Sequence, residues 1–305
     1  MTTRSALPGR DTNADQSALA FAWLEVTGFC NLECTHCYAD SSPRGTHGTM
    51  TAERWKDCVD QLAAMGVSDV QFIGGEPTLY PHLTDLIAHA ARAGLAVEVF
   101  SNLTHVPDEL WATFAEYRVK LATSYYSDTA EEHDAVTVRP GSHRRTRANI
   151  QRARELGLTL RGAVISALPG QRADDAFRDL TDLGLTAVGG DHTRAIGRAG
   201  KGARPTVADL CGQCAQGKLA IGPDGDVWPC VIGRFISMGN VLVSPLKDIW
   251  ADPATRRARA EIEAVHRPQP AQSCTPPQCL PWCGPCSPCA PDAEATIEVS
   301  GQIGP

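Results

Sequence analysis

Short apolar runs alternate with amphipathic stretches along the chain from about residue 18 to residue 190. Apolar runs of this length predict buried strands at Ala18–Thr27, Asp69–Ile73, Ala96–Phe100, Val119–Tyr126, Thr159–Ser166 and Thr186–Val188. Apolar residues at helical spacing predict helices between them at Thr51–Met65, Pro81–Ala93, Asp108–Tyr117, His143–Leu156 and Ala173–Leu183. Strands that alternate with helices form βαβ units, so the pattern predicts an α/β fold with a parallel sheet.

The alternation stops after about residue 195, where several glycines mark a linker. From Arg267 to Pro291 the chain is dominated by Pro and Cys. Such a segment cannot build its own hydrophobic core, so we expect metal coordination to order it. The pattern therefore predicts four parts: a flexible N-terminus (1–17), a β/α domain (18–200), a cysteine-rich domain (201–291) and a C-terminal tail (292–305).

Composition and charge narrow the classes of function. The chain has 305 residues, of which 43% are hydrophobic and 21% charged, and this excludes a disordered or fibrous protein. It contains no run of about 18 apolar residues and no signal-peptide core, so we expect a cytoplasmic protein that does not contact a membrane. The net charge of −7 disfavours nucleic acid as a partner, because phosphate-binding proteins usually carry a basic surplus.

The chain contains 12 cysteines, which is a high number for its length. An even count also suits disulfides, but disulfide scaffolds are short and secreted. Clustered cysteines in a reducing compartment indicate metal ligands instead. Cys58 differs from the others, because it lies on the apolar face of a predicted helix, where core packing is expected.

Three cysteines follow the first predicted strand in a C-x3-C-x2-C pattern, namely Cys30, Cys34 and Cys37. Three thiolates on one loop can hold an iron–sulfur cluster and leave one iron without a protein ligand. An open iron is what a cluster needs in order to bind a substrate or cofactor. A zinc site is the alternative, with His36 or His47 as the fourth ligand.

A second motif, Gly74-Gly75-Glu76-Pro77, follows the second predicted strand. In parallel β/α folds, ligands bind beyond the carboxyl ends of the strands. The two glycines allow the backbone to approach a ligand, and Glu76 supplies a carboxylate for an ammonium group. The two motifs together predict a cluster and an amino-bearing ligand at one barrel mouth.

These two motifs resemble those of the radical S-adenosylmethionine (SAM) enzymes, over roughly residues 20 to 200. The resemblance implies a partial (β/α)6 barrel in which the C-x3-C-x2-C cysteines bind a 4Fe-4S cluster whose unique iron chelates SAM. It also implies that Glu76 binds the amino group of SAM and that His36 lies near the adenine. Ribose or carboxylate contacts are expected at Ser101, Asn102 and Ser124.

The chain departs from the family after the fourth strand. Relatives often have His-Asp-x-x-Arg there, with the Arg on the SAM carboxylate, whereas here His133-Asp134 is followed by Arg139. The role falls to Arg139, Arg144 or Arg161. The alternative is that this basic run is a solvated helix start.

The C-terminal third resembles the SPASM extension of the same family. Cys214, Gly225 and Cys230 fit its Cys-x9–15-Gly-x4-Cys opening, and residues 194–199 resemble its usual lead-in. The resemblance implies two auxiliary 4Fe-4S clusters, and eight cysteines follow residue 210: Cys211, Cys214, Cys230, Cys274, Cys279, Cys283, Cys286 and Cys289. The alternatives are a zinc knuckle, or one auxiliary cluster with spare thiols.

Three residues at strand ends are candidates for contact with the substrate. Asp191 and His192, followed by Arg194, stand at the end of the sixth predicted strand, although a polar strand end is often only solvated. Tyr125 and Tyr126 alternate in the fourth strand, so that one faces the barrel and the other a helix. Tyr125 is the candidate here, with core packing as the default.

The resemblance implies reductive cleavage of SAM to a 5′-deoxyadenosyl radical that abstracts hydrogen from a substrate. Most SPASM enzymes act on peptides, so a peptide maturase is expected, with flavodoxin or ferredoxin as the reductant. Too few residues precede the barrel for a leader-binding domain, and a separate leader-peptide recognition protein is therefore expected. One alternative is an enzyme acting on a small sugar or nucleoside. Another is an electron-transfer protein, which would leave Gly74-Gly75-Glu76 unexplained.

Overall fold

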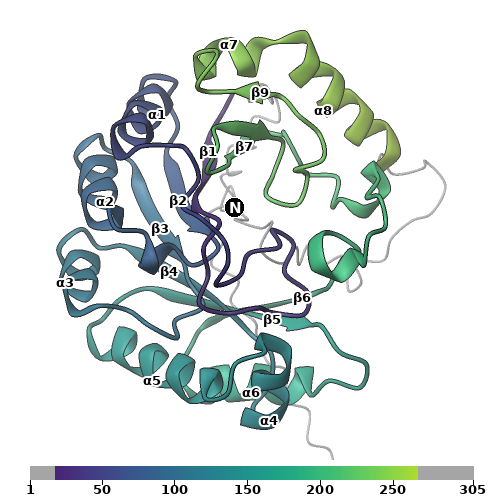
Figure 1. Cartoon of the computed structure of the whole chain (residues 1–305). Coiled ribbons are helices and arrows are strands. Elements are labelled where there is room, and N and C mark those ends of the chain that lie inside the picture. Colours follow the sequence, from purple (N-terminus) through teal and green to yellow (C-terminus); the bar gives the residue numbers. More distant parts are fainter. Residues whose placement is uncertain (1–17, 267–305) are drawn as a thin grey trace, which may run out of the picture.

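The computed structural model describes residues 18–266, which form a curved sheet with helices on its outer side (Figure 1). The sheet has nine strands in the order β6-β5-β4-β3-β2-β1-β7-β8-β9. The parallel part contains β1 (Phe21–Thr27), β2 (Asp69–Gly74), β3 (Ala96–Phe100), β4 (Lys120–Tyr125), β5 (Leu160–Ser166) and β6 (Ala187–His192). This arrangement is the partial (β/α)6 barrel that the resemblance to radical SAM enzymes implies.

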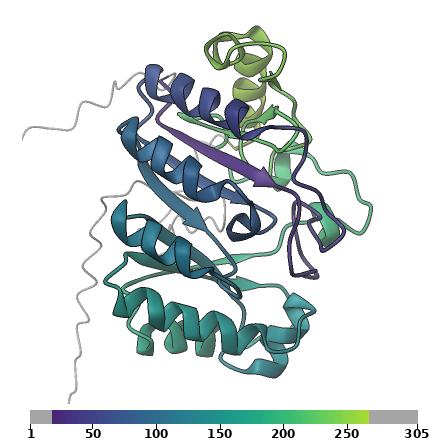
Figure 2. The same cartoon turned by 60° about the vertical axis from the view of Figure 1, so that its left-hand side comes forward.

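The helices connect successive strands and cover the convex face of the sheet (Figure 2). They are α1 (Ala52–Ala64), α2 (Leu83–Arg92), α3 (Asp108–Glu116), α4 (Ala130–Thr137), α5 (Ser142–Glu155) and α6 (Ala173–Asp182). All five predicted helices and all six predicted strands are confirmed to within a few residues. The sequence pattern missed α4, whose end contacts the cysteine loop described below.

The main core lies between the sheet and these helices. Trp55, Leu62, Phe72, Leu86 and Phe114 are fully buried there. Each such side chain contributes about 1.5–3 kcal/mol by leaving water. Cys58 is 1% exposed within this core, which confirms the prediction of a packing role.

The C-terminal part continues the same sheet. Strand β7 (Lys218–Ile221) pairs in parallel with β1, and β8 (Asp226–Trp228) and β9 (Gly239–Asn240) follow as antiparallel strands. Helices α7 (Leu246–Ala251) and α8 (Pro253–His266) and the short 3-10 turns η1 (Pro77–Leu79), η2 (Gly197–Gly200) and η3 (Val207–Asp209) complete the elements. The pattern of apolar runs did not predict β7 to β9.

A second apolar cluster fills the inside of the barrel and joins it to the C-terminal part. Trp23 and Ile73, which come from β1 and β2, pack there with Trp228, Cys230 and Ile232. Packing across this boundary fixes the C-terminal part against the inner face of the sheet. No helix within residues 18–266 is long and apolar enough to cross a membrane.

Candidate functional site

A cavity opens at the carboxyl ends of the six parallel strands, with about 940 Å³ of empty space including its mouth. Its wall includes residues that come from, or directly follow, each of these strands. Ten residues predicted from the sequence for this site line it: Cys30, Cys34, His36, Cys37, Gly74, Gly75, Asn102, Ser124, Asp191 and His192. The predicted convergence of the two motifs on one barrel mouth is therefore present in the structure.

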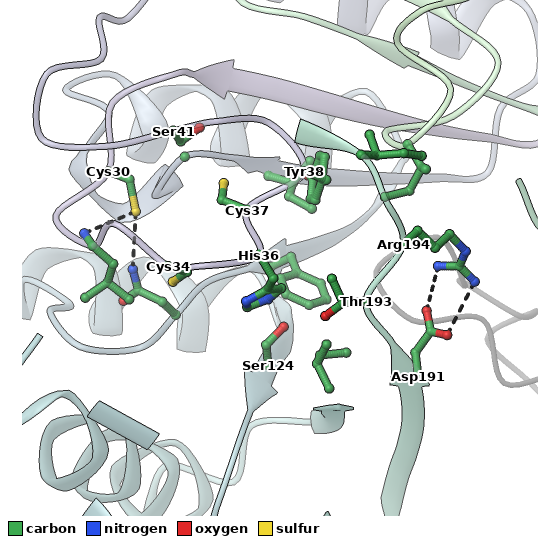
Figure 3. Close-up of a pocket in the computed structure, with 18 of the residues that line it drawn as sticks. Cys30, Cys34, His36, Cys37, Tyr38, Ser41, Ser124, Asp191, Thr193 and Arg194 are labelled. Carbon is green, nitrogen blue, oxygen red and sulfur yellow. Dashed lines mark hydrogen bonds and ion pairs between the residues drawn. The ribbon is translucent and has the colours of Figure 1, made fainter. Parts of the chain in front are cut away.

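The cysteine loop, residues 28–42, leaves β1 and presents its three thiols to this cavity (Figure 3). Two N–H donors point at the sulfur of Cys30, namely the backbone N–H of Leu32 at 3.4 Å and the Asn102 amide at 3.8 Å. Such donors suit a thiolate that is bound to iron. All three cysteines are free of disulfides.

The chemistry of these thiols suits metal ligation. Burial raises the pKa of Cys30, and burial also raises the pKa of Cys34, to about 12. At neutral pH such thiols stay protonated unless a metal replaces the proton. Among the described residues, no three Cys, His, Asp or Glu side chains converge on a point suited to a single metal ion.

The two histidines that the zinc alternative required have other surroundings. The ring of His36 packs edge-on against Tyr126, with the ring centroids 5.0 Å apart. Burial lowers the pKa of His36 to about 4, so the ring is neutral, and its Nδ1 has no hydrogen-bond partner among the described residues. His47 Nδ1 lies 2.8 Å from the Thr27 hydroxyl, and its ring contacts Phe29 and Tyr80.

Gly74 and Gly75 hold the start of the cysteine loop against the end of β2. The Gly75 N–H donates to the Thr27 carbonyl at 2.7 Å, and the Glu76 N–H donates to the Phe29 carbonyl at 2.9 Å. A Cβ at Gly75 would lie 2.2 Å from the Phe29 carbonyl oxygen. The glycines therefore permit close contact between two backbone segments, in addition to the approach to a ligand that we expected.

Glu76 is fully buried directly behind this turn, and it does not itself line the cavity. Its carboxylate accepts hydrogen bonds from the Thr78 N–H and hydroxyl, the Ser101 hydroxyl and the Asn102 N–H, at 2.7–3.0 Å. Burial raises the pKa of Glu76, and these donors oppose that shift. The carboxylate is thus tied to Asn102, which does line the cavity.

Besides Glu76, four other candidate site residues lie away from the cavity wall: Pro77, Ser101, Arg139 and Tyr125. Pro77 begins η1, and Ser101 supports Glu76. Arg139 is exposed. Of the two other arginines considered for the SAM carboxylate, Arg144 is exposed, and Arg161 pairs with Glu98 at 2.8 Å.

The adjacent tyrosines divide as their alternation predicts, and Tyr126 is the one in the cavity wall. The Tyr125 hydroxyl points to the helices, where it lies 2.8 Å from His143 Nε2 and donates to Asp179 at 2.5 Å. The assignment of Tyr125 as a substrate contact therefore does not fit the structure, because β4 turns its side chain outward. The alternation in the sequence predicted that the two tyrosines face opposite sides of the sheet, but it did not predict which of them faces the cavity.

The end of β6 forms the wall opposite the cysteines (Figure 3). Asp191 pairs with Arg194 at 2.8 Å, and its side chain is 2% exposed. The His192 side chain is 75% exposed at the mouth. Arg194 is thus among the residues that line the cavity, which Arg139 is not, and its guanidinium is bound to Asp191.

The C-terminal part brings together the first three of its cysteines. Cys214 Sγ lies 3.1 Å from Cys230 Sγ, and hydrogen bonds with Cys211 and Cys230 raise the pKa of Cys214. Gly225 stands in the turn between β7 and β8 with φ of 84°. The other predicted ligands of the auxiliary clusters lie outside the described residues: Cys274, Cys279, Cys283, Cys286 and Cys289.

Sequence reasoning missed one group in this region, a buried ion pair between Glu25 and Arg234. The Arg234 guanidinium lies 2.9 Å from the Glu25 carboxylate and 4.4 Å from the centre of the Trp228 ring. The pair joins β1 to the C-terminal part next to Cys230. The sequence signal that could have revealed this pair is the charged residue Glu25 within an apolar run that predicts a buried strand.

Comparison with known proteins identifies two family models in the chain. The model of the radical SAM superfamily matches residues 24–183, which is more than half of the chain. The SPASM model, described as an iron-sulfur cluster-binding domain, matches residues 211–290. The second match includes all eight C-terminal cysteines.

Several individual proteins are similar to the chain. The subtilosin biosynthesis protein AlbA of Bacillus subtilis is 25% identical, over 88% of this chain and 66% of AlbA. The PqqA peptide cyclase of Xanthomonas campestris is 28% identical, over 74% of this chain and 72% of the cyclase. The structure of Streptococcus suis SuiB bound to the precursor peptide SuiA has a TM-score of 0.66 and 16% identity, over 80% of this chain and 67% of SuiB. The chain thus spans about two thirds of the length of AlbA and SuiB.

Proposed function

The chain belongs to the radical SAM superfamily, and we propose that it uses SAM and iron–sulfur clusters to modify a peptide. One observation carries the proposal. The three thiols of the cysteine loop line the same cavity as the glycine turn that follows β2. A cluster and a SAM molecule bound there would face the β6 wall, where a substrate can enter.

The residues present fit a 4Fe-4S cluster held by the three cysteines of the loop. When bound, such a cluster supplies the electron that splits SAM and so starts hydrogen abstraction from the substrate. The protein's own contribution is orientation and the exclusion of side reactions. Leu32 and Asn102 donate toward the Cys30 sulfur and hold that ligand in place.

For SAM itself, we assign contacts to residues in or behind the wall. We assign the amino group of SAM to Glu76, which lies directly behind the glycine turn. The ammonium would replace one of the hydrogen-bond donors that the Glu76 carboxylate has in this structure. Neutral His36, beside Tyr126, offers a flat face to the adenine. We assign the SAM carboxylate to Arg194, rather than to an arginine after the fourth strand, because Arg194 is among the residues that line the cavity.

The peptide substrate is inferred from relatives. AlbA is named for the biosynthesis of a bacteriocin, and the PqqA cyclase for a peptide. We further propose that flavodoxin or ferredoxin delivers the electron and that a separate protein presents the leader peptide.

The test is a reaction of anaerobically reconstituted protein with SAM, dithionite and the peptide encoded by a short reading frame beside its gene. We expect 5′-deoxyadenosine together with a changed peptide. Loss of two hydrogens indicates a crosslink or oxidation, and uptake of one deuterium from heavy water indicates epimerisation. If the enzyme consumes a sugar or a nucleoside instead and leaves the peptide unchanged, the small-molecule alternative replaces the peptide assignment.

A further inference from the structure

Arg198, in the 3-10 turn η2 after β6, reaches back to the cysteine loop from more than 150 positions along the chain. Its guanidinium donates to the Cys34 carbonyl at 2.7 Å and to the Ser41 carbonyl at 2.6 Å. It also pairs with Asp40 at 3.1 Å, and its backbone N–H donates to the Cys37 carbonyl at 2.9 Å. One residue therefore makes four polar contacts with a single loop.

The cysteine loop needs such an external support because it is not part of a helix or sheet. On one side, the end of α4 supplies this support. The Val136 carbonyl accepts a hydrogen bond from the Thr35 N–H, and the Thr137 carbonyl accepts one from the Glu33 N–H. On the other side, Arg198 donates to the carbonyls of Cys34 and Ser41. A planar guanidinium that donates to two carbonyls holds them at a fixed spacing, so Arg198 fixes both ends of the segment 34–41.

The backbone next to Arg198 is packed equally closely on this loop. Gly197 has φ of 59°, and a Cβ there would lie 2.4 Å from the carbonyl oxygens of both Cys37 and Tyr38. Only glycine fits that position without moving the loop. The contact therefore depends on two successive residues, Gly197 and Arg198.

We propose that Arg198 is a positioning residue for the iron–sulfur site, which it supports by fixing the carbonyls that flank Cys37. The inference rests on the proposed function, because it assumes that the loop binds a cluster. It makes assembly of the N-terminal site depend on the junction between the barrel and the C-terminal part.

The experiment compares full-length Arg198→Met and Arg198→Lys with the wild type and with Arg204→Met as the matched control. Arg204 is an exposed arginine in the same linker. After anaerobic reconstitution, iron loss to a chelator is followed together with the electron paramagnetic resonance signal of the reduced protein, with and without SAM. The SAM-responsive part of the signal reports the N-terminal cluster, and the remainder reports the auxiliary clusters.

We expect Arg198→Met to lose the SAM-responsive signal ~10- to 100-fold faster than the wild type, as is typical when support behind metal ligands is removed. Arg198→Lys should lie between the two, because an ammonium keeps the charge but cannot bridge two carbonyls as a planar fork does. The auxiliary signal and Arg204→Met should match the wild type. Hydrogen exchange at the Cys37 and Asp40 amides should also increase in Arg198→Met, even without iron.

The inference is overturned if Arg198→Met keeps both the SAM-responsive signal and wild-type exchange at these amides. It is also overturned if Arg198→Met loses the auxiliary signal to the same extent, because that outcome indicates general unfolding. A wild-type protein with no SAM-responsive cluster would instead overturn the proposed function. Hydrogen exchange on the iron-free protein distinguishes failure of the Arg198 inference from failure of the proposed function, because it does not depend on a bound cluster.

Discussion

Replacement of Gly75 by alanine tests how closely β2 must approach the cysteine loop. An added Cβ would lie 2.2 Å from the Phe29 carbonyl oxygen and 2.6 Å from the Phe29 carbonyl carbon. Ordinary contacts of a Cβ begin at 3.4 Å, so the two segments must separate by about 1 Å. Both neighbours are backbone, and no side-chain rotation can relieve the clash.

The expected cost follows from this displacement. Overpacking of this kind lowers the free energy of unfolding by about 1–3 kcal/mol. The separation also stretches the hydrogen bond from the Glu76 N–H to the Phe29 carbonyl, which measures 2.9 Å. Because the cysteines follow Phe29 directly, they move relative to the SAM site. A misplacement of about 1 Å costs ~100-fold in rate.

The assay is the rate of 5′-deoxyadenosine formation from SAM under dithionite, in protein reconstituted without oxygen. Gly190→Ala is the matched control, because the nearest atom to its Cβ would be the Val164 carbonyl oxygen at 3.8 Å. We expect Gly190→Ala to match the wild type and Gly75→Ala to fall by about two orders of magnitude. A Gly75→Ala protein with full iron and the wild-type rate would refute this reasoning.

Further predictions concern the ion pair, the tyrosines and the iron content. Arg234→Met should lower the free energy of unfolding by about 3–5 kcal/mol because it leaves Glu25 buried and unpaired, and adding Glu25→Gln should recover part of this loss in urea titrations. Tyr125→Phe should reduce stability by ~1–3 kcal/mol but leave SAM cleavage unchanged, whereas a large loss of cleavage would return Tyr125 to the site. Reconstituted wild-type protein should bind about twelve irons by chemical analysis, while about four irons, or stoichiometric zinc, would contradict two auxiliary clusters.

Much of the fold could be predicted because each helix of the barrel buries one face. The first helix shows this: Trp55, Cys58 and Leu62 recur at helical spacing and all lie in the core. Strands β7 to β9 could not be found in this way, because they have only 4, 3 and 2 residues. Strand β7 pairs with β1, which is distant in the sequence, and β8 and β9 are added in turn beside β7.

The site was predictable where its residues are close together in the sequence. The cysteines and the Gly74-Gly75 turn are two such local groups, and the β/α pattern places both at strand ends. The contact that Arg198 makes could not be recognised, although residues 194–199 resemble the SPASM lead-in, because its side chain binds carbonyls of residues 157 and 164 positions away. Backbone acceptors leave no mark in the sequence, so only the structure reveals this contact.

The central claim is that the cysteine loop holds the cluster that cleaves SAM. The most direct test measures 5′-deoxyadenosine formation by Cys34→Ala beside Cys58→Ala, both reconstituted and reduced in the same way. Cys34 lines the cavity, whereas Cys58 is buried in the core between the sheet and α1. The account predicts no product from Cys34→Ala, with the auxiliary iron retained, and cleavage by Cys58→Ala close to the wild type. Wild-type cleavage by Cys34→Ala, or its loss in Cys58→Ala alone, would contradict the claim.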